Sequence, residues 1–268
     1  MHSPLKDPRT RYPGQSLSEQ ISDISLDQSA EILMPALVWL IAMLEWLRYS
    51  IPAKPSPWLW TFMALIATWF CVRRIRTMAK RKKNLRKGMV GEQILGKYLE
   101  EQLMPDKYHI LHDLIGKNGE KTFNIDHVIV GPTGIFSVET KNWTNPDGTH
   151  HQIYYDGKQI LVDGRHPDKD PLTQGIAGGK WVSDILETLT GKHFFVQPIV
   201  VFLGSYTTKN PGNAPAWVLN EQAVPSFIRH NFSELSHDDV GLVTAQLKKY
   251  SEDCDKKAGA GYCAEAAT

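Results

Sequence analysis

The chain of 268 residues contains little cysteine, and the three cysteines that it has lie far apart. Cys71, Cys254 and Cys263 follow neither the spacing of a zinc site nor that of a disulfide framework. Cys71 lies in an apolar run and the other two lie near the C-terminus, which fits a reducing compartment for the soluble part. The cysteines therefore argue against a disulfide-stapled domain and against a structural zinc site.

Other common signals are also missing. Residues 1–30 are polar and include several prolines, so the first apolar run begins too late for a cleaved signal peptide. We expect residues 1–30 to be mostly disordered, with at most a short helix near 16–28. Gly175, Gly178 and Gly179 do not follow the spacing of a P-loop, which argues against that kind of phosphate-binding loop. No internal repeat is found.

The net charge is only +1, but the charges are unevenly distributed. Residues 73–87 hold nine basic residues and no acid, and +1 overall less this +9 leaves −8 for the rest of the chain. A basic block of this kind flanks a membrane segment on its cytoplasmic side, or binds anionic headgroups or a nucleic-acid backbone. These roles do not exclude one another, and we favour the topological one.

Two apolar runs precede the basic block, at 32–47 and 58–72. Both are somewhat shorter than the roughly 20 residues that span a bilayer, but flanking residues can extend each of them. Tryptophans near the ends of the second run and prolines between the runs are typical of two spanning helices. We therefore expect a transmembrane hairpin at 31–72 and a juxtamembrane linker at 73–87, with two buried core helices as the alternative.

The basic block sets the expected orientation. Positively charged flanks stay on the cytoplasmic side, so the chain from Arg73 onward is expected in the cytoplasm. Two passes return the N-terminus to the same side. The predicted protein is thus an integral membrane protein with a cytoplasmic soluble domain, in a bacterial cell at the inner membrane.

Residues 124–141 are the most informative stretch. They contain two β-branched runs, 125–130 and 135–140, around the turn sequence Gly-Pro-Thr-Gly. Proline suits the second position of a tight turn and glycine tolerates unusual dihedral angles at its ends. The pattern predicts an antiparallel hairpin in which Gly131 pairs with Gly134.

This register places charged residues on one face of the hairpin. Asp126 would face Glu139, and Lys141 would share the face of Glu139 because strand residues alternate. Two acids opposite each other destabilise a sheet, unless a divalent cation such as Mg²⁺ or Mn²⁺ binds both. A solvated face on which Lys141 neutralises one acid is the alternative, and the spacing alone leaves both open.

The remaining pattern predicts an alternation of helices and strands. A helical stripe at 89–103 is followed by a strand at 108–115 and then by the hairpin. The segments expected after the hairpin are a small hairpin at 151–155 and 158–162, a helix at 171–190, strands at 194–203 and 216–219, helices at 221–230 and 237–250, and a flexible tail at 251–268. The order predicts an α/β or α+β sheet flanked by helices.

Three motifs follow one another along the soluble part of the chain: Gly88-x-x-Gly91-Glu92, Ile125-Asp126-His127 with the glycine turn, and Glu139-Thr140-Lys141-Asn142-Trp143. Together they resemble the nuclease-related domain family, called NERD, which is similar to the PD-(D/E)xK nucleases. The resemblance covers roughly residues 88–205. The resemblance implies an α/β fold with a restriction-endonuclease-like mixed sheet over 88–250, and a metal-dependent nuclease activity on DNA or RNA.

The resemblance also implies a role for each site residue. Asp126 and Glu139 would bind Mg²⁺ or Mn²⁺, with Glu92 as a further acid beside the metal. Lys141 would position or activate the attacking water and stabilise the phosphate. Gln174 would be the polar residue of the second helix.

Two positions depart from the superfamily pattern. Ile125 stands where proline is usual, and Thr140 stands where a β-branched apolar residue is usual. Threonine is still β-branched and keeps its strand propensity. Neither change removes a metal ligand.

Other polar and aromatic residues have weaker claims to a role. Trp143 and Lys180 can contact nucleic acid together with Lys141, but Trp143 is equally an anchor of the fold and Lys180 an ordinary solvated lysine. His127 points away from the Asp126 face in a regular strand and is expected to be a packed histidine. His150 and His151 with Asp147 form a possible but weak metal motif.

The sequence therefore predicts a membrane-anchored, Mg²⁺-dependent nuclease whose partners are DNA or RNA and the lipid bilayer, with a homodimer as a further possibility. The first alternative is a nucleic-acid-binding or scaffold protein that has the fold without useful cleavage. A second is a membrane protein whose soluble domain binds a partner and uses the acids structurally.

Overall fold

A computed structural model describes residues 11–48, 57–119, 121–143, 149, 151–207 and 211–258. The chain divides into two units, which are considered separately. The helical unit is Leu17–Lys87, and the sheet unit is Met1–Ser16 together with Gly88–Thr268.

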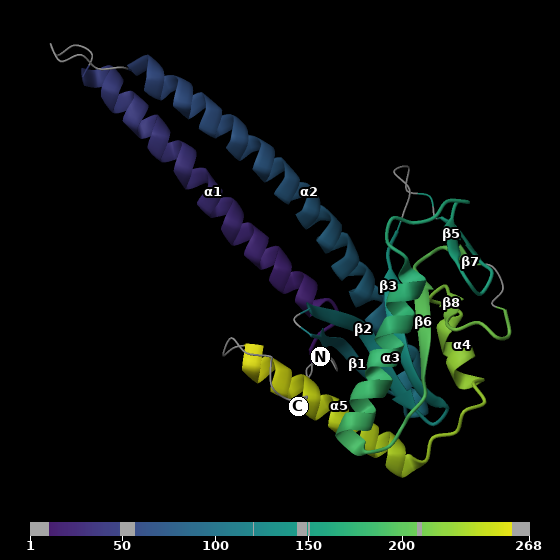
Figure 1. Cartoon of the computed structure of the whole chain (residues 1–268). Coiled ribbons are helices and arrows are strands. Elements are labelled where there is room, and N and C mark those ends of the chain that lie inside the picture. Colours follow the sequence, from purple (N-terminus) through teal and green to yellow (C-terminus); the bar gives the residue numbers. More distant parts are fainter. Residues whose placement is uncertain are drawn as a thin grey trace. The chain divides into compact units, whose positions relative to one another are not determined.

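The helices and strands follow one another in the order seen in Figure 1. They are α1 (Gln15–Arg48), α2 (Pro57–Leu103), a 3-10 turn η1 (Met104–Asp106), β1 (His109–Asn118), β2 (Lys121–Gly131), β3 (Gly134–Lys141), β4 (Gln152–Tyr155), β5 (Ile160–Val162), α3 (Pro171–Thr190), β6 (Val196–Phe202), β7 (Tyr206–Thr207), β8 (Trp217–Leu219), α4 (Val224–Arg229) and α5 (His237–Ala258).

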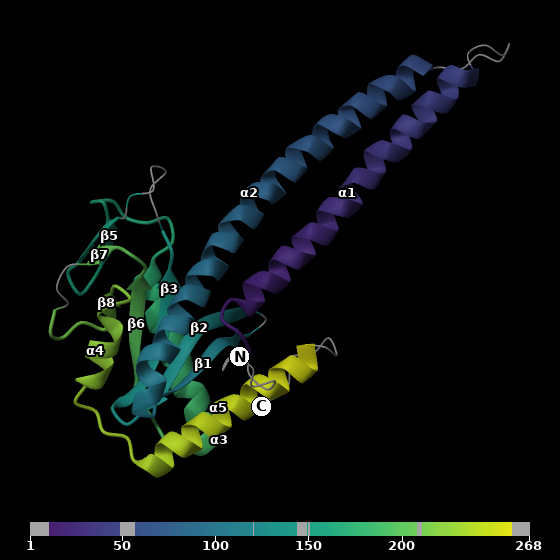
Figure 2. The same ribbon diagram turned by 180° about the vertical axis from the view of Figure 1, so that it is seen from behind.

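In the helical unit, α1 and the first part of α2 run side by side in opposite directions (Figures 1 and 2). Trp39 Nε1 donates to Thr68 Oγ1 at 2.9 Å, and Trp46 Nε1 donates to Thr61 Oγ1 at 3.0 Å. Each indole N–H thus has a hydrogen-bond acceptor on the neighbouring helix, which links the two helices.

The short helix expected near 16–28 lies within α1, which begins at Gln15 and is much longer, so the disorder expected for residues 1–30 does not hold from Gln15 onward. Residues 15–34 contain neither glycine nor proline, so nothing in this stretch breaks a helix. Acids recur every four residues from Glu19 to Glu31, and Glu31 pairs with Arg74 of α2 at 2.8 Å. Pairing with the basic block therefore gives the polar half of α1 a partner that local composition does not reveal.

The basic block at 73–87, which we expect to be a juxtamembrane linker, is helical. No glycine or proline occurs between residues 58 and 87, so α2 continues without a break from Pro57 to Leu103. The second apolar run, the basic block and the helix expected at 89–103 are one element.

Among the described residues, one helix, α1, is long and apolar enough to cross a membrane by length and composition. Only 6% of its most apolar window is buried. The apolar run of α2 at 58–72 is shorter and leads directly into Arg73 and Arg74. The structure therefore provides one candidate span, and the transmembrane hairpin stays a prediction.

The sheet unit contains a five-stranded sheet in the order β1-β2-β3-β6-β8. The β1, β2 and β3 strands are antiparallel, whereas β3, β6 and β8 are parallel to one another. A smaller sheet, β5-β4-β7, contains the hairpin expected at 151–162 and adds the short strand Tyr206–Thr207, which the sequence did not predict. The predicted α/β class with a mixed sheet flanked by helices is confirmed.

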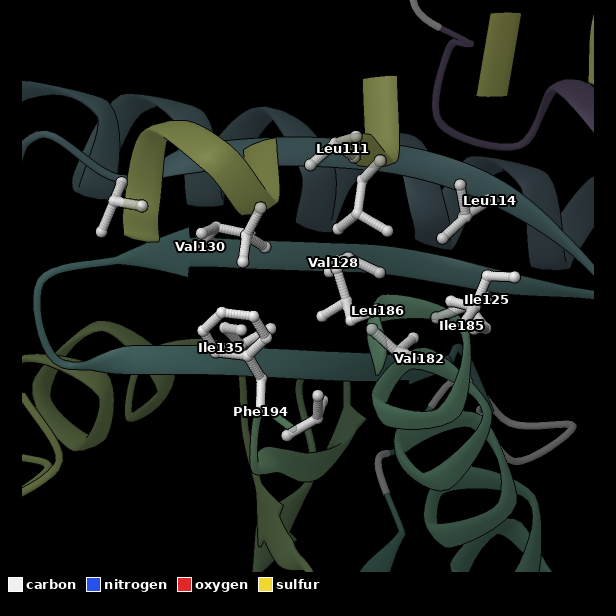
Figure 3. Close-up of a cluster of buried hydrophobic side chains, with 14 residues drawn as sticks. Leu111, Leu114, Ile125, Val128, Val130, Ile135, Val182, Ile185, Leu186 and Phe194 are labelled. Carbon is white, nitrogen blue, oxygen red and sulfur yellow. The ribbon is translucent and has the colours of Figure 1, made fainter. Parts of the chain in front are cut away.

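Helices cover both faces of the large sheet. Figure 3 shows Leu111 and Val128 of the strands in one cluster with Val182 and Leu186 of α3, and residues of α5 belong to the same cluster. On the other face, Leu95 of α2 is fully buried in a second cluster to which α4 contributes. The hairpin β2-β3 therefore lies in the middle of the molecule's core, with α3 on one side and α2 on the other.

The ends of α3 lie where the sequence predicted them. The Asp170 side chain accepts hydrogen bonds from the backbone N–H of Leu172 and Thr173, and Gly191 ends the helix at φ +69°. By contrast, α5 continues to Ala258, so the flexible tail expected from residue 251 does not begin there.

Candidate active site

The β2-β3 hairpin has the predicted register. Gly131 pairs with Gly134, and the ladder continues to His127 opposite Val138. Gly134 has φ +129°, a conformation that side chains rarely adopt, which explains the glycine at the end of the turn. The ladder ends at His127 and Val138, and the next residues along the two strands are Asp126 on β2 and Glu139 on β3.

Asp126 is nearly fully buried at this point, with 5% of its surface exposed. The backbone N–H of Thr140 donates to Asp126 Oδ2 at 2.6 Å, which holds the carboxyl group against β3. Burial raises the pKa of Asp126 well above its usual value, and the charges of Glu139 and Glu92 raise it further. The two predicted acids therefore interact electrostatically across the hairpin.

Lys141 links Glu139 to the helix on the same face of the sheet. Its Nζ donates to Glu139 Oε1 at 2.5 Å and to Gln174 Oε1 at 3.0 Å. Gln174 lies in the first turn of α3, whose start is fixed by the Asp170 cap. Burial raises the pKa of Glu139, while the Lys141 ammonium lowers it in part. The structure thus brings three of the predicted residues into direct contact.

Glu92 reaches the same region from α2. It is 5% exposed, the backbone N–H of Gly14 donates to it, and its Oε2 has no hydrogen-bond partner among the described residues. Burial, followed by the charges of Asp113 and Glu139, raises the pKa of Glu92 to about 8. An unpartnered carboxylate oxygen beside other acids is costly for folding alone and is typical of a functional site.

Sequence reasoning missed Asp113, which lies on β1 beside this cluster. Asp113 is fully buried with φ +52°, and its carboxylate accepts hydrogen bonds from Asn124, Arg11 and Ser16. Both carboxylate oxygens of Asp113 accept hydrogen bonds within the protein, so Asp113 has a structural role beside the acids and is not placed to bind a ligand. A single acid inside the apolar strand expected at 108–115 was the one signal in the sequence.

Arg11 was also missed. It is 4% exposed, its Nε lies 2.8 Å from Asp113, and its Nη1 lies 2.5 Å from Asp255 of α5. Arg11 thus holds the segment before α1 on the sheet unit. No local pattern predicts this contact, because its partners lie more than a hundred residues away.

His127 is packed, as expected, and belongs to a chain of buried polar groups on the other face of the sheet. His127 Nδ1 and His112 Nδ1 are 2.9 Å apart, and His112 Nε2 lies 2.8 Å from Glu100 Oε1. Burial, and then the charge of His112, lower the pKa of His127 well below its usual value. The chain points away from the Asp126 face.

The remaining predicted residues lie further from the acids. Trp143 packs edge-on against Phe202 at 5.4 Å between ring centroids, in the cluster beneath the small sheet. Lys180 is exposed on α3 and lines a cavity beside Glu139. His151 lies 2.5 Å from Asp163. Asp147 and His150 lie outside the described residues.

The residues fit a divalent cation in their chemistry. Three buried carboxyl groups, Glu92, Asp126 and Glu139, share one ammonium, Lys141, so ionising all three leaves negative charge in excess. Hard carboxylate oxygens are the ligands of Mg²⁺, which typically takes one or two carboxylates and keeps several waters. Within the described ranges, no group of three or more His, Cys, Asp or Glu side chains forms a ready-made metal site.

Comparison with known proteins identifies this part of the sheet unit. Residues 87–203 match the family described as the nuclease-related domain, NERD. This stretch is a nuclease-related domain. It contains the three buried acids Glu92, Asp126 and Glu139, and also Lys141 and Gln174. Arg11, α5 and most of the helical unit lie outside the match.

The chain is also similar to an uncharacterized protein of Bacillus anthracis. The two chains are 38% identical over 58 residues, which is 21% of this chain and 27% of the relative. The chain thus spans about a quarter of that relative's length. No solved structure matches the chain.

Proposed function

We propose that this chain is a membrane-anchored, Mg²⁺- or Mn²⁺-dependent nuclease that hydrolyses phosphodiester bonds in DNA, with RNA as the alternative substrate. The observation that supports it is the contact of Lys141 with Glu139 and Gln174, beside buried Asp126 inside a NERD domain. Buried acids that repel one another weaken the fold, and such arrangements concentrate at functional sites.

The proposed roles follow from the contacts. Asp126 and Glu139 would hold the cation, with the orphan oxygen of Glu92 as a further ligand. A bound divalent ion would supply an acidified water and neutralise the charge of the phosphodiester. Lys141 would stabilise the charge that develops on the phosphate, because its ammonium is fixed next to the site. Gln174 would orient that ammonium from α3.

A cleavage assay tests the proposal. The full chain in detergent is incubated with single-stranded DNA, double-stranded DNA and RNA, in Mg²⁺, Mn²⁺ or EDTA. We expect metal-dependent cleavage that falls by at least about 100-fold in Asp126→Ala and in Lys141→Ala, the usual size of such losses. Asp239→Ala and Lys192→Ala remove an exposed ion pair and serve as matched controls with unchanged rates.

The outcomes separate the alternatives. Cleavage that survives both Asp126→Ala and Lys141→Ala would mean that the site is misassigned. Tight nucleic-acid binding by the wild type without cleavage in either metal would support the binding or scaffold protein instead.

A further inference from the structure

A cavity of about 650 Å³ lies between strands β1 to β3 and helix α3. Its lining includes Glu139 and Gln174, so it adjoins the acidic cluster directly. The volume lies within the range of about 300–1,000 Å³ that is usual for ligand pockets. The roles proposed above make no use of this cavity.

One wall of the cavity is aromatic. Phe123 and Trp181 meet edge to face with their centroids 5.6 Å apart. Trp181 is held in place, because its Nε1 donates to the backbone oxygen of Lys117 at 3.0 Å and its ring lies 5.7 Å from that of Tyr250. Rings that are already fixed lose little freedom on binding, and every nucleobase offers a flat face to pack against them.

The cavity also presents polar groups. Ser137 is 2% exposed and lines the cavity, and its Oγ has no hydrogen-bond partner among the described residues. Asn124 lines it too, oriented by its amide hydrogen bond to Asp113. Lys117 and Lys180 line the cavity with positive charge, and Asp184 lines it with negative charge beside Glu139. An apolar wall, hydrogen-bonding groups and cations together match a base attached to a phosphate.

We propose that this cavity is a nucleobase pocket that binds an unpaired base next to the phosphodiester held at Glu139 and Lys141. The position of that phosphodiester rests on the proposed function. A base within a duplex is stacked and paired and cannot enter such a cavity, so the preferred substrate is a single strand or a nucleotide turned out of the helix.

Gly178 provides a specific way to fill the pocket. It lines the cavity, and a Cβ there would meet only Ile125 Cγ1 at 3.6 Å, an ordinary contact. Gly178→Leu therefore occupies the pocket without disturbing α3, since leucine favours a helix more than glycine does. Gly241→Leu is the matched control: it lies within α5, does not line the cavity, and a Cβ there would meet nothing within 4 Å.

Binding is measured by calorimetry with the full chain in detergent and EDTA. The probes are adenosine and deoxythymidine 5′-monophosphates, with inorganic phosphate for comparison. We expect at least one of the two nucleotides to bind the wild type and Gly241→Leu with similar affinity. The same nucleotide should bind Gly178→Leu at least tenfold more weakly. Three results would each contradict the proposed pocket. They are equal nucleotide affinity of Gly178→Leu and the wild type, no nucleotide binding to the wild type at millimolar concentrations, and binding of inorganic phosphate as strong as that of the nucleotides.

A cleavage measurement separates this inference from the proposed function. In Mg²⁺, Gly178→Leu is expected to cleave single-stranded substrate at least tenfold more slowly than Gly241→Leu. A normal cleavage rate for Gly178→Leu would contradict the nucleobase pocket and leave the proposed nuclease activity supported. Nucleotide binding in EDTA that depends on Gly178, without cleavage by the wild type, would reject the nuclease and keep the pocket.

Discussion

At the residue scale, burial opposes the ionisation of three neighbouring carboxyl groups, which together form the acidic cluster. Glu92, Asp126 and Glu139 all have raised pKa values, and burial is the largest cause in each case. Lys141 offsets only part of the charge. The cluster therefore makes the stability of the metal-free protein depend on pH.

The first prediction concerns Glu92, whose pKa is raised to about 8. Between about pH 4.5 and 8 the folded state keeps a proton here that the unfolded state has lost, so the free energy of unfolding falls as pH rises. In EDTA, Glu92→Gln should remove part of this fall, each pKa unit being worth about 1.4 kcal/mol. Urea unfolding across this pH range measures it.

The control for this prediction is Glu101→Gln, an exposed acid on the same helix. It should leave the pH dependence unchanged. Equal slopes for the wild type and Glu92→Gln would mean that Glu92 is ionised in the folded protein and that its orphan oxygen has another partner.

A second residue-scale prediction concerns Arg11. Arg11→Ala leaves Asp113 buried without its counter-charge, and breaking a buried pair in this way costs about 3–5 kcal/mol. Arg229→Ala removes an exposed partner of Asp106 and should cost about 1 kcal/mol or less. Urea unfolding compares the two variants, and an equal loss in both would contradict the anchoring role of Arg11.

Residue spacing alone reveals the local part of the site, whereas Glu92 and Gln174 were predicted only through the family resemblance, and Asp113 and Arg11 by neither. Asp126, Glu139 and Lys141 belong to one short hairpin, and the predicted register Gly131 to Gly134 holds up to His127 and Val138, the residues next to Asp126 and Glu139. Asp113 and Arg11 meet across 102 residues, and neither carries a local signal that names the other. Short-range geometry can be predicted from residue spacing, whereas a buried ion pair between remote segments depends on the complete fold.

At the element scale, the same contrast separates α3 from α2. The ends of α3 were predicted because Asp170 and Gly191 are local stop signals that act through the backbone. The continuous course of α2 was not predicted, because a run of like charges is typical of a solvated linker. Its helical state is helped by acids on α1, such as Glu31 opposite Arg74.

The continuity of α2 gives the third prediction. Backbone amides at 73–87 should be protected from hydrogen exchange as strongly as those of the flanking helix, because α2 is unbroken there. Asn84→Pro removes a helical hydrogen bond and costs about 3 kcal/mol of helix stability, so protection should be lost nearby, while Asn84→Ala should keep it. Fast exchange at 73–87 in the wild type would restore the linker interpretation.

At the scale of the whole molecule, the two ends of the helical unit restrict the possible topology. The segment before α1 is fixed to the sheet unit by Arg11 and Ser16, and α2 enters the same unit at Gly88. Both ends therefore lie on the same side of any membrane as the sheet unit. If α1 crosses the bilayer, the chain must cross back before Gly88, and 58–72 is the remaining apolar run that can do so.

We therefore predict that the chain crosses the membrane twice. Arg48, at the end of α1, is then expected on the other side of the membrane from the sheet unit. In a chain whose native cysteines are replaced by serine, Arg48→Cys should react with an impermeant maleimide in spheroplasts. The matched Lys169→Cys, exposed on the sheet unit, should react only after permeabilisation, because a basic flank favours the cytoplasmic side and we expect the sheet unit there. Labelling of both cysteines from one side would rule out the two-pass arrangement, and recovery of the chain without detergent in the soluble fraction would rule out the membrane anchor itself.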